Sequence, residues 1–297
     1  MIERLVVIGV GLIGGSFAAA LKARGQVGHV VGVGRSTANL EQARKLGLID
    51  SIAGVAEAVR GADFILLATP VGQMEAQFGA MAPYLDRAAV VTDGGSTKAD
   101  VVAAARRGLG ATVAQFIPAH PIAGSEKSGA GAALADLFLG RRTVLTPIAE
   151  NKPASIARVR AAWEICGATV VEMRAAEHDT VLGITSHLPH VLAYAMMHQV
   201  FTDPQQALLL ANAGSGFRDF TRLAGGQPEM WRDILLSNRS ALLAAMDGFD
   251  ASVATLRAAI EGEDGALLDR IFGASRTQRE AWLARNESGT RAPRGEE

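Results

Sequence analysis

The sequence predicts an α/β protein with a doubly wound, mostly parallel sheet, followed by an all-α domain. Through residues 1–173, short apolar runs alternate with helical patterns, which is typical of βαβ units. From residue 174 the chain becomes rich in alanine and leucine and has few strand-like runs. The last residues carry Ser, Gly, Thr and Pro between charges. We therefore expect a sheet domain at 1–173, a helical domain at 174–285 and a disordered tail at 286–297.

The expected strands are apolar runs bounded by turn residues. They are Leu5–Gly9, His29–Val33, Asp63–Ala68, Ala89–Asp93, Gln115–Pro118, Arg142–Thr146 and Ala168–Glu172. Helical patterns lie between most of them, including Lys98–Arg107 and Pro153–Cys166. The second of these begins with a proline, which is favoured in the first turn of a helix.

Composition narrows the class of protein. The 297 residues are 49% hydrophobic and 20% charged with a net charge of −1, as in ordinary globular proteins. Since no basic block is present, we expect no nucleic-acid partner. The single cysteine, Cys166, rules out an internal disulfide and fits a reducing, cytoplasmic compartment. The first strand begins near Met1, so we expect no targeting peptide.

The segment Thr180–Thr202 contains no Asp, Glu, Lys or Arg. It does contain His187, His190 and His198, which are costly to bury in lipid. We therefore expect a buried helix inside a bundle and no membrane partner. The apolar content of the helical domain is high for a lone bundle, which predicts a homodimer that shares this burial.

Gly9-x-Gly11-x-x-Gly14 directly follows the first expected strand and opens a helical pattern. Gly9 suits a tight turn, Gly11 lets a pyrophosphate approach the backbone, and Gly14 allows close packing of helix on strand. The phosphates would lie at the helix N-terminus, at Leu12 and Ile13, where the free N–H groups favour negative charge. The motif predicts a Rossmann-type dinucleotide-binding domain; the alternative is a turn with a packing role.

The end of the second expected strand bears on the choice of cofactor. A site for NAD usually offers an acidic residue there for the ribose 2′-hydroxyl. This chain has Gly34, Arg35, Ser36 and Thr37, and the last three can bind a 2′-phosphate. We therefore favour NADP. The alternative is that Arg35 stacks on the adenine and that the protein uses NAD.

Further turns follow other expected strands. Thr69-Pro70 and the turn at Ser96 come after the third and fourth strands, where they should face the cofactor. Either could also be a plain turn. His120 lies between Pro118 and Pro121 just past a strand end, so its backbone is restrained. That suits a general base beside a nicotinamide; the alternative is a histidine bonded to a carbonyl.

Several motifs together resemble the prephenate/arogenate (cyclohexadienyl) dehydrogenase family, which makes tyrosine or its precursor. They occur in the family's order over residues 1–285. The motifs are GxGLIGGS from Gly9, GGSTK from Gly94, HPIAGSEKSG from His120, SHLPH from Ser186 and GFRDFTR from Gly216.

The resemblance implies roles for individual residues. His120 is similar to the family's catalytic histidine, which takes the proton of the substrate's ring hydroxyl. Ser96 matches a serine near that hydroxyl, and Arg222 looks like the arginine that binds a substrate carboxylate. The remaining residues expected at the substrate pocket are Ser125, Glu126, Ser186, His187, His190, Asp219 and Trp231. Gly34 departs from the family pattern, since members that use NAD tend to have aspartate there.

The resemblance thus implies oxidative decarboxylation of prephenate or arogenate, with hydride transfer to NAD(P), in tyrosine biosynthesis. One rival is a β-hydroxyacid dehydrogenase, a family with a catalytic lysine on its second domain. This chain has no lysine after Lys152, which argues against that reading. The other rivals are a nucleotide-sensing regulator and a metal site at His187 and His190. We expect no metal.

Overall fold

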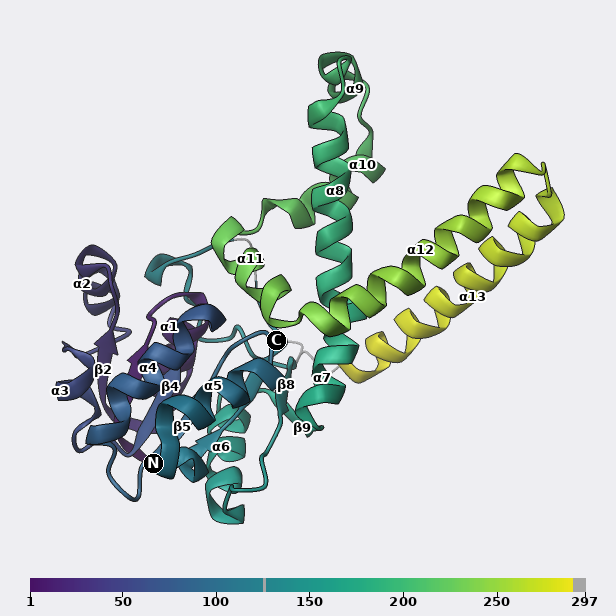
Figure 1. Cartoon of the computed structure of the whole chain (residues 1–297). Helices are drawn as coiled ribbons and strands as arrows, with labels where there is room; N and C mark the ends of the chain where they lie inside the picture. The colour runs from purple at the N-terminus through teal and green to yellow at the C-terminus, as the bar shows by residue number, and fades with distance from the viewer. Residues whose placement is uncertain (125–126, 291–297) are drawn as a thin grey trace, which may run out of the picture. The chain divides into compact units, whose positions relative to one another are not determined.

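The computed structural model of the chain describes residues 1–124 and 127–290, with side chains up to residue 285. The chain divides into two compact units, Met1–Leu242 and Leu243–Glu297 (Figure 1). The first unit contains two sheets and the helices that cover them. The second consists of helices.

A six-stranded parallel sheet forms the centre of the first unit. Its strands are β1 (Ile2–Ile8), β2 (Val27–Val33), β3 (Ser51–Ile52), β4 (Phe64–Leu67), β5 (Val90–Asp93) and β6 (Phe116–Ile117). They lie in the order β3-β2-β1-β4-β5-β6, and every neighbouring pair is parallel. The strand order reverses between β1 and β4, which opens a crevice at their carboxyl ends. The predicted doubly wound fold is confirmed.

The alternation of side chains along β1 explains how both faces of the sheet are covered. Leu5 and Val7 pack with α1 (Leu12–Ala23) and α6 (Pro153–Ile165). Val6 and Ile8 point to the opposite face. The helices on that face are α3 (Val55–Val59), α4 (Met74–Met81) and α5 (Ala99–Leu109). Helix α2 (Thr37–Lys45) follows β2. Because both faces are buried, β1 reads as an apolar run in the sequence.

A second sheet has three strands, β7 (Ala119–Pro121), β8 (Arg142–Leu145) and β9 (Thr169–Glu172). Strands β7 and β8 are antiparallel, and β8 and β9 are parallel. The sequence indicated β8 and β9 but not that they leave the main sheet, and it missed β3 and β7. Strands of two or three residues are too short for a periodic pattern, and Pro118, which has no N–H, separates β7 from β6.

Helices make up the rest of the first unit. They are α7 (Ala175–Leu182), a π-helical turn (Gly183–His187), α8 (Leu188–Thr202), α9 (Gln206–Ala211), α10 (Ser215–Thr221) and α11 (Pro228–Ser237). Short 3₁₀ segments lie at Val71–Gln73, Ala82–Tyr84, Gly110–Gln115, Ala130–Ala132 and Arg222–Gly225.

The expectation that 180–202 forms a buried helix is wrong for the single chain. Along α8 only Leu188 and Ala193 are buried, and Phe201 is 69% exposed. Among the described residues, no helix combines the length and apolar character needed to cross a membrane.

The second unit is a pair of antiparallel helices (Figure 1). It contains α12 (Arg239–Glu261) from Leu243 onward and α13 (Gly265–Thr290). Glu263 has a φ of 51° in the turn between them, and the Asp264 carboxylate accepts the N–H of Leu267 at 2.9 Å, capping α13. Because α13 continues to Thr290, the predicted tail starts later than 286. Residues 291–297 lie outside the described part, so their disorder stays a prediction.

Candidate active site

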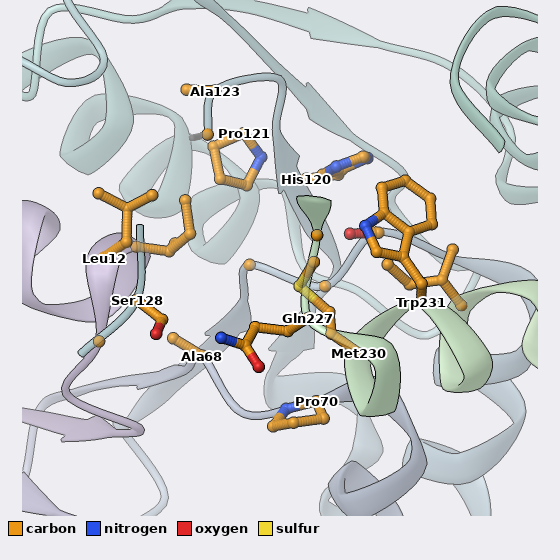
Figure 2. A pocket seen from close by; sticks show the side chains of 18 of the residues that line it. Leu12, Ala68, Pro70, His120, Pro121, Ala123, Ser128, Gln227, Met230 and Trp231 are labelled. Carbon is orange, nitrogen blue, oxygen red and sulfur yellow. The ribbon is translucent and has the colours of Figure 1, made fainter. Parts of the chain in front are cut away.

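A cavity of about 960 Å³ opens at the carboxyl ends of β1, β4 and β5. The turns after these three strands line one part of it. Other parts of the wall come from β7, residues 122–124 and 127–129, the π-helical turn, α8, the 3₁₀ turn at Arg222–Gly225 and α11. Figure 2 shows Leu12, Pro70, His120, Met230 and Trp231 projecting into this pocket. All residues that line it belong to the first unit.

The turn Gly9–Gly14, which we call the glycine cradle, leaves free space beside Gly11. Gly9 has a φ of 98°, and a Cβ there would lie 2.5 Å from the carbonyl oxygen of Ala68. A Cβ on Gly14 would lie 2.2 Å from the carbonyl oxygen of Gly9, so neither position tolerates a side chain. A Cβ on Gly11 would meet nothing within 4 Å. Gly11, Leu12 and Ile13 line the cavity, while Gly9 and Gly14 hold the backbone behind them.

The residues of this cradle fit a dinucleotide. Gly11 is the N-cap of α1 and supplies no side-chain cap, so the first N–H groups of the helix are available to an anion. Thr69, Pro70 and Ser96 line the neighbouring wall. The Thr69 hydroxyl is buried and has no hydrogen-bond partner in the described part of the chain. An unpaired buried hydroxyl is costly, and a polar group of a ligand would satisfy it.

The residues expected to choose the cofactor lie beyond the cavity wall. Gly34, Arg35 and Ser36 are exposed at the carboxyl end of β2. Ser36 is the N-cap of α2, and its hydroxyl accepts the N–H of Asn39 at 3.2 Å. A Cβ on Gly34 would touch Leu40 at 3.4 Å, an ordinary contact.

His120 reaches the cavity from β7, and its ring contacts His178. The distance from its Nδ1 to Nε2 of His178 is 2.8 Å. Burial, then the nearby His178, Lys98 and His187, lower the pKa of His120 well below 6.5. The imidazole is therefore neutral at physiological pH and able to accept a proton.

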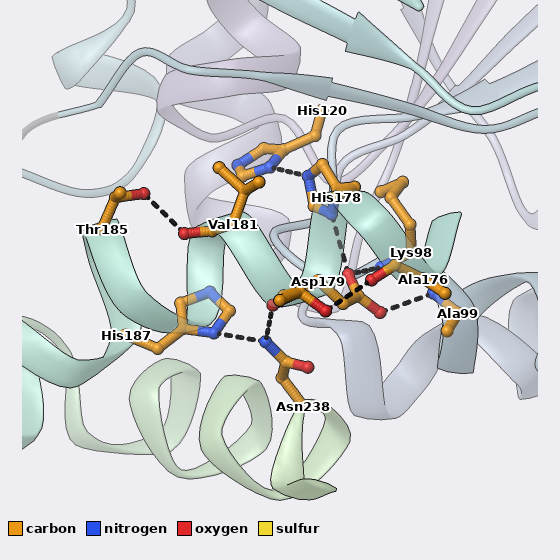
Figure 3. Close-up of polar contacts among 12 residues, drawn as sticks. Lys98, Ala99, His120, Ala176, His178, Asp179, Val181, Thr185, His187 and Asn238 are labelled. Atoms are coloured by element: carbon orange, nitrogen blue, oxygen red, sulfur yellow. Dashed lines mark hydrogen bonds and ion pairs between the residues drawn. The ribbon is translucent and has the colours of Figure 1, made fainter. Parts of the chain in front are cut away.

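His178 continues to a buried carboxylate (Figure 3). Its Nδ1 lies 2.7 Å from Oδ1 of Asp179. The Asp179 carboxylate also accepts the backbone N–H groups of Lys98 and Ala99, each at 2.8 Å, at the start of α5. His178 is fully buried and Asp179 is 4% exposed. Sequence analysis missed both residues, because their partners lie far away along the chain.

A second buried pair fixes the strand that carries His120. Lys98 and Asp93 are both fully buried, and Nζ of Lys98 donates to Oδ2 of Asp93. Asp93 also accepts the N–H of Gly95 and the N–H of Ala119, each at 2.9 Å. The end of β5 is thereby tied to the start of β7, one residue before His120.

The helical side of the cavity presents an aromatic platform. The rings of His190 and Trp231 stack with centroids 3.5 Å apart. Nδ1 of His190 donates to the carbonyl of Ser186 at 2.9 Å, which leaves Nε2 for a ligand. Burial lowers the pKa of His190, so this ring too is neutral at physiological pH. Ser186, His190, Arg222 and Trp231 all line the cavity.

Other residues predicted for the site lie elsewhere. His187 is 1% exposed and is not part of the cavity wall; the π-helical turn directs it to Asn238, whose Nδ2 donates to its Nδ1 at 2.9 Å. Burial lowers the pKa of His187 to about 4. Asp219 is exposed on α10 outside the cavity wall. Ser125 and Glu126 lie outside the described residues.

The proposed metal alternative finds no support in this geometry. His187 pairs with Asn238, and His190 stacks on Trp231. Within the described residues, no group of three or more His, Cys, Asp or Glu side chains could hold a metal ion. Cys166 is a free, buried thiol whose pKa burial raises to about 12.

One cavity thus contains the glycine cradle, the crevice at the strand reversal, a neutral histidine and an arginine. This combination defines the class of dehydrogenases with a Rossmann-type nucleotide-binding domain. The family model for the nucleotide-binding domain of prephenate dehydrogenase matches residues 17–172. The model for the dimerization domain of the same enzyme matches residues 174–274. The chain belongs to the prephenate dehydrogenase family.

Individual relatives agree over nearly the whole chain. A cyclohexadienyl dehydrogenase of Zymomonas mobilis is 37% identical over 93% of this chain and 95% of that protein. A prephenate dehydrogenase of Bacillus subtilis is 35% identical over 94% of this chain and 76% of that protein. The crystal structure of prephenate dehydrogenase from A. aeolicus, in complex with hydroxyphenyl propionate and NAD+, superposes with a TM-score of 0.88. It is 32% identical over 95% of this chain and 99% of that one.

Proposed function

We propose that this protein catalyses the oxidative decarboxylation of prephenate, arogenate or both in tyrosine biosynthesis. The products would be 4-hydroxyphenylpyruvate from prephenate and tyrosine from arogenate. The observation that carries the proposal is a neutral His120 in one cavity with both the glycine cradle and Arg222. Membership of the family supports the same reaction.

The residues divide the chemistry among them. The cradle at Gly11, Leu12 and Ile13 would hold a nicotinamide cofactor, which would supply an acceptor for the hydride of the hydroxyl-bearing ring carbon of the substrate. His120 takes the hydroxyl proton on Nε2 as that carbon becomes a carbonyl. The bond to the ring carboxylate then breaks and carbon dioxide leaves. The electron pair of that bond passes through the ring to the carbonyl oxygen, which takes back a proton from His120 and becomes the phenol hydroxyl of an aromatic ring. Aromatisation drives the reaction, while the protein supplies placement and a base.

Substrate binding falls to the helical side. Arg222 is suited to a carboxylate, since its guanidinium donates two parallel hydrogen bonds. The stacked rings of His190 and Trp231 offer a flat face for the substrate ring. Ser96, Ser186 and His190 line the same cavity, which supports a hydrogen bond from Ser96 to the substrate hydroxyl. The roles of Ser125, Glu126 and Asp219 at the pocket mouth stay predictions from the resemblance.

For the cofactor we propose NADP in preference to NAD. The end of β2 carries no carboxylate that would repel a 2′-phosphate, and Arg35 and Ser36 are exposed there. Arg35→Ala should therefore lower kcat/KM for NADP more than for NAD. Equal effects on the two cofactors would contradict this role of Arg35.

Gly34→Asp gives the reciprocal test. The new side chain starts from an ordinary contact with Leu40, so it should fit without strain. Its carboxylate would repel the 2′-phosphate and accept the 2′-hydroxyl, which should shift preference toward NAD by at least tenfold in the ratio of kcat/KM values. Should the wild type already favour NAD, the NADP proposal fails.

We also propose a homodimer formed through the helical part of the chain, in the cytoplasm. Large apolar side chains are exposed on this part; among them are Phe201, Leu208, Leu209, Leu210 and Phe220. Their burial against a second copy is consistent with the match to a dimerization domain. The lone, unpaired thiol of Cys166 supports a reducing compartment.

A steady-state assay tests the reaction directly. Purified, folded protein is given prephenate or arogenate with NADP or NAD, and both cofactor reduction and carbon dioxide release are followed. With at least one of the two acids, the proposal predicts that reduced cofactor and carbon dioxide form in equal amounts. Cofactor reduction with neither acid would contradict it, as would reduction without release of carbon dioxide.

A further inference from the structure

Hydrogen bonds join His120 to His178 and His178 to Asp179, and we call these three side chains the relay (Figure 3). The surroundings of Asp179 determine which atom donates and which accepts in each bond. Asp179 receives two backbone N–H groups at the start of α5, from Lys98 and Ala99. Burial raises the pKa of Asp179, but the hydrogen bonds from His178, Ala99 and Lys98 outweigh it and lower the pKa overall. Asp179 is therefore an ionised carboxylate, which only accepts hydrogen bonds.

The proton positions follow from that starting point. Because Asp179 only accepts, Nδ1 of His178 must carry a proton. In a neutral imidazole the other nitrogen then has the lone pair, so Nε2 of His178 accepts. Nδ1 of His120, 2.8 Å away, must donate to it. The lone pair of His120 is thereby left on Nε2, the nitrogen available to the cavity.

We infer that His178 and Asp179 are positioning residues that hold His120 in the tautomer whose Nε2 accepts the substrate proton. Neither lines the cavity, so they act through His120. The Asp179 carboxylate also offsets the positive charge that His120 gains when it takes the proton, because it lies directly behind the His178 imidazole. The inference deepens the proposed function and rests on His120 being its base.

The relay matters because the groups around His120 oppose its protonation. Titratable groups on three elements act electrostatically on this ring: His178 on α7, Lys98 at the start of α5 and His187 on the π-helical turn. Each disfavours a charged His120. The Asp179 carboxylate is hydrogen-bonded to His178, which is hydrogen-bonded in turn to the His120 ring. Replacing Asp179 should therefore change the tautomer of His120 and raise the free energy needed to protonate His120.

Asp179→Asn should exchange donor and acceptor in both hydrogen bonds of the relay. An amide N–H donated to Nδ1 of His178 would move the His178 proton to Nε2, which would then donate to Nδ1 of His120. The His120 proton would lie on Nε2, where it blocks the base. We expect kcat to fall by about 10²-fold or more with KM little changed, as for a carboxylate that orients a catalytic histidine.

The tautomer can be measured without substrate. In full-length protein labelled with ¹⁵N-histidine, the ring ¹⁵N chemical shifts distinguish protonated from unprotonated nitrogens, and His120→Asn assigns the His120 signals. We expect an unprotonated Nε2 on His120 in the wild type and a protonated one in Asp179→Asn. A protonated Nε2 in the wild type, or the same tautomer in both proteins, would overturn the inference. Because no turnover is involved, this result is separate from failure of the proposed reaction.

A control variant separates the loss of positioning from general damage to the fold. Asp50→Asn is the matched control, because Asp50 also accepts a backbone N–H, from Val30 at 2.8 Å, and pairs with Lys22 far from the cavity. It should leave both kcat and the His120 tautomer unchanged. A kcat loss in Asp50→Asn as large as in Asp179→Asn would contradict a specific role for Asp179.

His178 provides a test if Asp179→Asn does not fold. In His178→Gln the side-chain oxygen can accept the proton of His120 Nδ1, whereas in His178→Leu nothing replaces the acceptor. We expect His178→Gln to keep kcat within about tenfold of the wild type and His178→Leu to lose about 10²-fold. Equal kcat values in the two variants would overturn the assignment.

Discussion

Arg222 and His120 reach the same cavity from separate parts of the fold, a 3₁₀ turn after α10 and strand β7. The arginine carries a fixed charge suited to a carboxylate, and the histidine is kept neutral by burial and by its neighbours. We therefore propose that substrate binding and proton transfer depend on different residues. Their replacement should leave different kinetic signatures.

Arg222→Ala should raise KM strongly and lower kcat much less. The variant loses a charge-assisted pair worth about 1.5–3 kcal/mol, which corresponds to roughly a tenfold to hundredfold rise in KM. Arg222→Lys should recover little, because an ammonium does not make the forked contact. Steady-state kinetics with either acid measures both effects.

Arg218 offers the control for this measurement. It lies one helical turn before Arg222, is exposed and does not line the cavity. Arg218→Ala removes the same charge and should change KM by less than about twofold, since exposed charges are screened. A similar rise in KM for both variants would show that Arg222 acts through the overall electrostatic field of the protein and not by direct contact with the substrate.

At the scale of the elements, the contact between the end of β5 and the start of β7 sets the position of His120. The buried Asp93–Lys98 pair forms that contact, since Asp93 also accepts the N–H of Ala119. Removing one member of a buried ion pair leaves the other uncompensated. Lys98→Met should lower the free energy of unfolding by about 3–5 kcal/mol, as measured by denaturant unfolding.

A double-mutant cycle checks the origin of that loss. The variant Lys98→Met with Asp93→Asn should lose less than the sum of the single losses, because no lone charge remains buried. Lys22→Met breaks the partly exposed pair with Asp50 and should cost only about 0–1 kcal/mol. Strict additivity of the Lys98 and Asp93 losses would contradict the coupling of the two residues.

The same elements show how far sequence alone could predict the site. Gly11, Ser96 and His120 are recognisable because each lies in a short motif directly after a strand, so the motif fixes its place at the sheet edge. His178 and Asp179 carry no such signal, because their partners His120, Lys98 and Ala99 are distant in sequence and meet them only in the folded chain.

His187 illustrates the opposite error. The family resemblance of its motif implied a place at the substrate pocket, and its spacing from His190 raised the alternative of a metal site. The π-helical turn at Gly183–His187 changes the direction in which the side chain points, and His187 packs against Asn238 instead. A local change of helix type is not visible in residue spacing. The separate β7–β9 sheet escaped prediction for a related reason, since its pairing depends on long-range contacts.

For the whole molecule, the proposed homodimer would cover the exposed apolar side chains of the helical part. Light scattering of the purified protein should give a mass near twice 31.0 kDa at concentrations where it is active. Leu209→Asp with Phe201→Asp places charges on two exposed apolar positions and should shift the equilibrium toward monomer. An active wild-type monomer in dilute solution would refute the dimer.

The most direct test of the proposed reaction is the pH dependence of kcat/KM for the wild type and for His120→Asn. The neutral form of His120 is the active one, and its pKa lies well below 6.5, so protonation should reduce activity only as the pH falls through that lowered value. We predict a wild-type kcat/KM that stays level from neutral pH down to about 6.5 and falls at lower pH. His120→Asn, still folded, should lose about 10²-fold or more in kcat together with this acid limb. A variant with near-normal kcat and the same acid limb would contradict the account and assign the base to another residue.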